Sequence, residues 1–81
     1  MFISESIATR TIRDFLSGEN PFCDADHVIS KIMNVFEDLE LGMRLGHTHG
    51  ERILAWRGVL KLFMQGHDME ALVEAEKIFA A

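Results

Sequence analysis

Apolar residues recur at helical spacing in four separate segments of the chain, and each of the first three ends in a glycine- or proline-containing stretch. No window alternates apolar and polar residues with a period of two, so no β-strand is predicted. This pattern constrains the fold more than any other feature of the sequence. It predicts one all-α domain spanning residues 1–81, with about four helices joined by short turns in a small bundle or helical array.

The first helix is predicted over residues 4–17, with Ser4 as its N-cap and Gly18 as its stop. Pro21 then breaks the helical pattern, because proline restricts the residue before it and cannot continue a helix. One stripe of the first helix collects the residues expected to face the core, namely Ile3, Ile7, Ala8, Thr11, Ile12, Phe15 and Leu16.

A second helix is predicted from a cap at Asp24 or Asp26 to about Leu45. Helical rotation places Leu41 and Leu45 on roughly the opposite side from its inner face. Two interpretations follow: a second contact surface near the helix end, or a bend or stop at Gly42 that resets the phase. The inner face itself comprises Val28, Ile29, Ile32, Val35, Phe36, Leu39 and Met43.

Thr48 followed three positions later by Glu51 forms a capping box, which predicts the start of a third helix that runs to about Gln65. Gly66 is its predicted stop, and Asp68 is the predicted cap of a fourth helix that continues to the C-terminus. The apolar positions expected to face inward are Ile53, Trp56, Val59, Leu60, Phe63 and Met64 in the third helix, and Met69, Leu72, Val73, Phe79 and Ala80 in the fourth.

Composition then limits the partners. Apolar residues make up 48% of the chain, and a domain of this size has too little interior to bury them all. We therefore expect a core completed by another protein or by a second copy as a homo-oligomer. A net charge of −5 disfavours nucleic acid, and no apolar run is long enough for a membrane span. No secretory signal is visible, which favours the cytoplasm.

Five residues at predicted helix ends are the candidates for a metal-dependent regulator: Cys23, His27, His47, His49 and His67. Zinc needs three or four such ligands converging in space, and no established ligand spacing occurs here. Nothing marks Cys23 as an activated nucleophile, and Glu37, Asp38 and Glu40 are too close in sequence to act from opposing elements. We therefore expect neither an enzyme nor a cofactor, and metal binding stays an alternative.

Residues 53–80 carry a resemblance to a known family. The glycine turn at Gly66, the run of small and large apolar residues in Glu70–Ala80, and Trp56 upstream together resemble a degenerate tetratricopeptide repeat. The spacing from Trp56 to Gly66 is one residue short, and Met69 stands where an aromatic is usual. Among short relatives, the chain is similar to chaperones of type III secretion needle subunits. That resemblance implies a TPR-like array that holds an amphipathic helix and prevents early polymerisation.

Excess apolar content and this hairpin together predict a small chaperone or adaptor that sequesters an amphipathic helix of a partner protein. A phage- or plasmid-type inhibitor that docks on a host protein fits the size and acidity equally well. Arg57 and Lys61 are expected to form a rim that steers an acidic partner. The full set of candidate contacts is Leu41, Leu45, Trp56, Arg57, Lys61, Phe63, Met64 and Met69.

Overall fold

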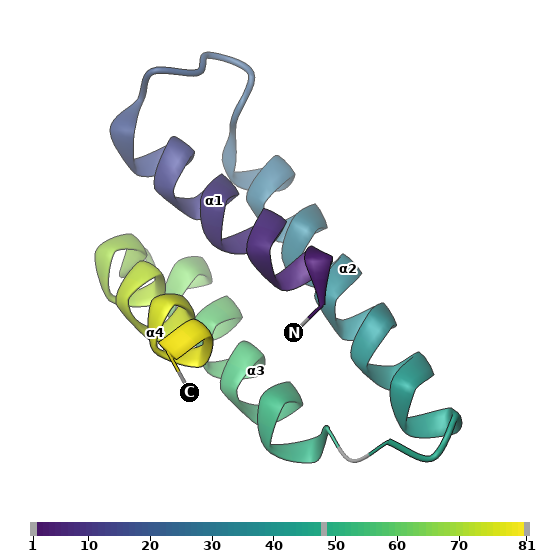
Figure 1. The fold of residues 1–81 in the computed structure, drawn as a ribbon. Helices are drawn as coiled ribbons and strands as arrows, with labels where there is room; N and C mark the ends of the chain where they lie inside the picture. The colour runs from purple at the N-terminus through teal and green to yellow at the C-terminus, as the bar shows by residue number, and fades with distance from the viewer. Residues whose placement is uncertain (1, 48, 81) are drawn as a thin grey trace.

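The computed structural model is an all-α bundle of four helices (Figure 1). It describes residues 2–47 and 49–80, with backbone only for residues 79 and 80. The helices are α1 (Ile3–Ser17), α2 (Ala25–Arg44), α3 (Gly50–Met64) and α4 (Asp68–Ala80). The predicted fold class and the approximate helix positions are confirmed. The predicted cap at Thr48 and the inward positions of Phe79 and Ala80 lie outside what is described.

Each helix packs against two neighbours, so the four form a closed ring around one core. α1 contacts α2 and α4, and α3 contacts α2 and α4. Short connections make consecutive helices antiparallel (Figure 1). The core is assembled from all four helices, with Trp56 as its largest member. Its buried apolar residues are Ala8, Ile12, Val28, Ile32, Val35, Leu39, Trp56, Val59, Phe63, Ala71 and Ala75.

Local chemistry explains several helix ends. The Asp24 side chain caps α2 by accepting a hydrogen bond of 2.8 Å from the backbone N–H of His27. Gly18 and Gly66 follow the ends of α1 and α3 with φ of 69° and 86°, which only glycine adopts at little cost. The predicted cap at Ser4 is wrong, because α1 begins at Ile3 and Ser4 lies within the helix.

The inward faces of α1 and α4 differ from prediction. Ile3 and Ile7 are exposed, while Glu5 and Thr9 are buried. In α1 the buried side follows Ala8 and Ile12, because the helix packs against both α2 and α4. In α4 the fully buried residues are Ala71 and Ala75, whose small side chains allow close helix packing, and Leu72 is partly buried against the core. Other residues predicted inward but found exposed are Met43, Met64, Met69 and Val73.

α2 is one continuous helix through Gly42, which settles the two interpretations of Leu41 and Leu45 in favour of a second exposed surface. At 1.5 Å per residue, the 20 residues of α2 span about 30 Å and the 15 residues of α1 about 22 Å. Figure 1 shows α2 continuing well past the start of α1. Among the described helices, none is both long enough and apolar enough to cross a membrane.

Candidate functional site

A groove lies where the overhanging end of α2 passes the start of α1. Its volume is about 670 Å³, and it is closed on one side by the α2–α3 loop. Three apolar side chains are exposed along it: Ile3 at 79%, Leu41 at 55% and Leu45 at 71%. We call this the end groove, and its lining residues are Phe2, Ile3, Asp38, Leu41, Gly42, Leu45, His47 and His49.

The length difference between α1 and α2 explains why these leucines are uncovered. Leu41 and Leu45 are one turn apart, so they lie on the same face of α2. α1 begins only at Ile3, so no earlier turn of that helix extends along the last turns of α2. The helices that line the groove are packed on the core, so the shape of the groove is set by the fold of the domain.

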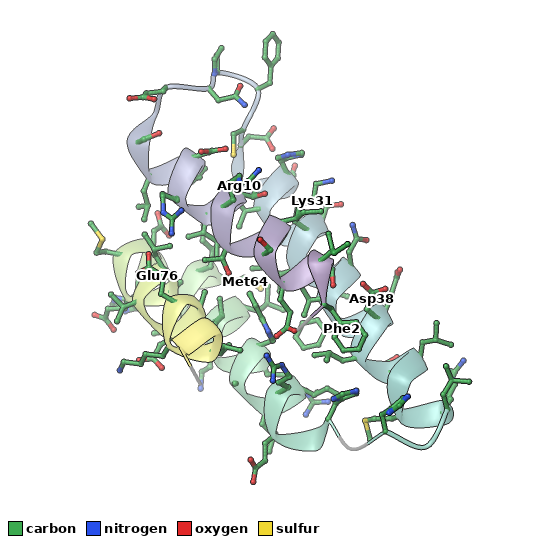
Figure 2. All side chains as sticks on the ribbon, viewed as in Figure 1. Phe2, Arg10, Lys31, Asp38, Met64 and Glu76 are labelled. Carbon is green, nitrogen blue, oxygen red and sulfur yellow. The ribbon has the colours of Figure 1, made fainter. Side chains whose placement is uncertain are left out.

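Close packing at Gly42 forms the floor of the end groove. A side-chain carbon at this position would lie 2.8 Å from the His49 ring, so only glycine lets the loop approach α2 this closely. The Phe2 ring meets the His49 ring edge to face, with centroids 5.2 Å apart. The His47 ring stacks on the His49 ring, with centroids 5.9 Å apart. Phe2 and Asp38 are both visible on this part of the molecule in Figure 2.

Glu5 anchors the same end of the bundle from beneath. Its carboxylate is only 1% exposed and accepts three hydrogen bonds, from the Phe2 backbone N–H at 3.1 Å, the Arg52 Nε at 2.9 Å and the Trp56 indole N–H at 3.0 Å. This network joins the start of α1 to α3, across the core from it. Sequence reasoning missed Glu5, because a glutamate in a first turn normally serves the helix dipole in solvent.

Two opposing effects act on the pKa of Glu5. Burial raises it, whereas the hydrogen bonds from Trp56, Phe2 and Arg52 and the charge of Arg52 lower it. The lowering effects prevail, so the pKa lies below the ordinary glutamate value. Glu5 is therefore ionised at neutral pH, and its charge is compensated by partners held in fixed positions.

The eight predicted contacts do not form one surface. Trp56 and Phe63 lie in the core, so their side chains are not exposed for direct contact with a partner in this structure. They are the two largest residues of the buried apolar face of α3. Leu41 and Leu45 line the end groove. The remaining four are exposed elsewhere: Arg57, Lys61 and Met64 on α3, and Met69 on α4.

The cysteine and the histidines are spread over three places: Cys23 and His27 near the start of α2, His47 and His49 after its end, and His67 between α3 and α4. Only His47 and His49 line the end groove, and the described residues contain no group of three His, Cys, Asp or Glu that could hold a metal ion. The Cys23 thiol donates a hydrogen bond of 3.4 Å to the Thr11 carbonyl. Burial, and then the charges of Asp14 and Asp24, raise the pKa of Cys23. A nucleophilic cysteine needs the opposite shift.

Against models of known protein families, curated proteins and solved structures, the chain gives no match. Interpretation of the site therefore depends on its own geometry.

Proposed function

We propose that the protein is a binding module, a chaperone or adaptor, whose end groove holds an amphipathic helix of a partner protein. The observation that carries the proposal is the exposure of Ile3, Leu41 and Leu45 side by side along one groove. Water contact with three large aliphatic side chains is unfavourable, and contiguous apolar surface of this kind is typical of protein-binding sites.

The chemistry of the groove defines the partner. Leu41 and Leu45 supply two anchors one helical turn apart, which suits a helix with apolar residues at i, i+3 or i+4, and i+7. Asp38 is half-buried on the rim, and no ion pair of Asp38 occurs within residues 2–47 and 49–80. A basic residue beside the apolar anchors of the partner would therefore be favoured.

The proposed place of action is the cytoplasm. The resemblance of residues 53–80 to needle-subunit chaperones makes the amphipathic C-terminal helix of a type III secretion needle protein the first peptide to test. The end groove lies outside that hairpin, on α1 and α2. Groove variants therefore test the binding proposal separately from the resemblance.

Photocrosslinking tests the proposal in the native host. A photoreactive phenylalanine analogue is placed at Leu45, and the matched control carries it at Phe22, which is 86% exposed in the α1–α2 loop. We expect Leu45 to crosslink to one segment of another protein with helical spacing of apolar residues, and Phe22 not to do so. Equal crosslinking at both positions, or a Leu45 product without that spacing, would contradict the proposal.

A further inference from the structure

A second surface of the bundle, on the outer side of α2, carries charged residues that take part in none of the ion pairs of the described residues. Met33, Glu37, Glu40 and Arg44 are spaced by four, three and four residues, so they share one stripe of α2. All four are exposed. The stripe lies on the side of α2 away from Asp38, which lines the end groove together with Phe2 and Ile3 at the start of α1. It therefore flanks α3, the other neighbour of α2.

α3 carries a matching stripe. Leu54, Arg57, Lys61 and Met64 are spaced by three, four and three residues and are all exposed. They lie on the side of α3 away from the buried Trp56. Half-buried Ile53 and Leu60 adjoin this stripe and pack against the core. We call the two stripes together the α2–α3 face.

Apart from Arg44 at the end of the α2 stripe, the charged residues of this face are acidic on α2 and basic on α3, and they are not paired with each other. Ion pairs among the described residues involve Arg13, Arg52, His67 and Lys77, and none of them joins the two stripes. The acids Glu37 and Glu40 therefore stand on α2 and the bases Arg57 and Lys61 on α3 without neutralising each other.

From this arrangement we propose that the α2–α3 face joins two copies of the chain in a two-fold symmetric dimer. A two-fold axis parallel to the helices lays α2 of one copy antiparallel on α3 of the other, because the rotation exchanges the two helices and keeps their direction. The acidic stripe of each copy then meets the basic stripe of the other, twice. Two faces with the same charge on both helices could not associate in this way.

The relative level of α2 and α3 along their axes within one chain is the same across the proposed interface. The approach of Gly42 to His49 sets how α2 lies along α3, and the two-fold operation preserves that level. Glu37 of each copy then stands within about one helical turn of Arg57 of the other, with Glu40 and Lys61 on either side of that pair. Exposed Met33, Leu54 and Met64 are covered at the same time, which completes the burial that a domain this small lacks.

Sedimentation equilibrium with charge-reversed variants tests this dimer. We expect the wild type to sediment as two 9.2 kDa chains. The basic-stripe variant Arg57→Glu/Lys61→Glu and the acidic-stripe variant Glu37→Lys/Glu40→Lys should each dimerise at least about ten-fold more weakly, because like charges then face each other. An equimolar mixture of the two variants should regain a dimer of wild-type affinity.

Two controls make the outcome decisive. Arg10→Glu/Lys31→Glu changes the net charge as much as the basic-stripe variant but lies on α1 and the other side of α2 (Figure 2), and it should leave the dimer unchanged. Leu41→Ser/Leu45→Ser removes two apolar anchors of the end groove and should also leave the dimer unchanged. This variant separates the dimer proposal from the partner-binding proposal. A monomeric wild type up to millimolar concentration would overturn the proposal. So would a mixture that stays monomeric, or a charge control that weakens the dimer equally.

Discussion

The two ends of the bundle are held together by different chemistry. At the end that carries the groove, a buried carboxylate at Glu5 joins the Phe2 backbone, Arg52 and Trp56. At the opposite end, Phe15 and Phe63 meet edge to face with centroids 5.2 Å apart. The groove end thus depends mainly on buried charged hydrogen bonds that fix the positions of its parts, whereas the far end depends mainly on apolar contact.

This difference fits the proposed role of the groove. A binding surface needs its parts held in fixed positions, and the groove assembles residues from the start of α1, the end of α2 and the following loop. Glu5 and the Gly42–His49 contact fix those three segments relative to one another. The far end carries no groove residue and needs only to be packed.

The largest expected effect is that of Trp56→Ala. This change removes the largest buried side chain and leaves Glu5 without its indole donor, so it should lower the free energy of unfolding by about 3–5 kcal/mol or prevent folding. Trp56→Phe keeps most of the volume and loses the hydrogen bond, so we expect about 1–3 kcal/mol. Urea unfolding followed by circular dichroism measures both. A Trp56→Phe variant as stable as the wild type would show that the hydrogen bond is not what distinguishes this end.

The pH dependence of stability distinguishes the two ends next. The pKa of Glu5 is lower in the folded chain than in the unfolded one, so its contribution is complete above the ordinary glutamate pKa and is lost as the pH falls through the folded value. Glu5→Gln should cost about 1–3 kcal/mol at pH 7 and less in acid. Phe63→Ala, at the far end, should cost about 3–5 kcal/mol at every pH at which the protein folds. A Glu5→Gln cost independent of pH would contradict the network.

A pair of glycines tests the packing of the groove floor. Gly58 is in the interior of α3 with open space around it, so Gly58→Ala should stabilise the protein by about 0.5–1 kcal/mol through helix propensity. Gly42→Ala gains the same propensity but pushes the His49 ring off the helix and away from Phe2. We therefore expect it to be about 1 kcal/mol less favourable than Gly58→Ala in thermal unfolding. Equal stabilisation by both would mean that the floor is not tightly packed.

The smallest effect is expected at the surface pair that joins α1 to α4. Arg13 lies 3.3 Å from Glu76, and both side chains are at least half exposed. Arg13→Ala should change the free energy of unfolding by no more than about 0.5 kcal/mol, because solvent screens such pairs. If Arg13→Ala lowered the free energy of unfolding as much as Glu5→Gln does, the buried hydrogen bonds of Glu5 would not be stronger than a solvent-screened surface ion pair.

Sequence reasoning succeeded where local chemistry decides the structure. Gly18, Asp24 and Gly66 act on their own neighbours, so the ends that they set could be predicted. The phase of Leu41 and Leu45 could also be predicted, because it follows from helical rotation alone.

It failed where distant residues decide. Glu5 is buried only because Trp56 and Arg52, about fifty positions away, supply its partners. Ile3 faces solvent because of how α1 sits against two other helices, and a single amphipathic stripe does not contain that information. The end groove itself depends on the different lengths of α1 and α2 after they have packed.

The most direct test of the central claim uses the segment crosslinked at Leu45 as a synthetic peptide. Isothermal titration calorimetry compares its affinity for the wild type, for Leu41→Ser/Leu45→Ser and for Phe22→Ser, which removes a still more exposed apolar side chain outside the groove. We predict that the groove variant binds at least about ten-fold more weakly, through lost apolar burial, and that Phe22→Ser binds like the wild type. Unchanged affinity in the groove variant would contradict the claim that this groove is the binding site.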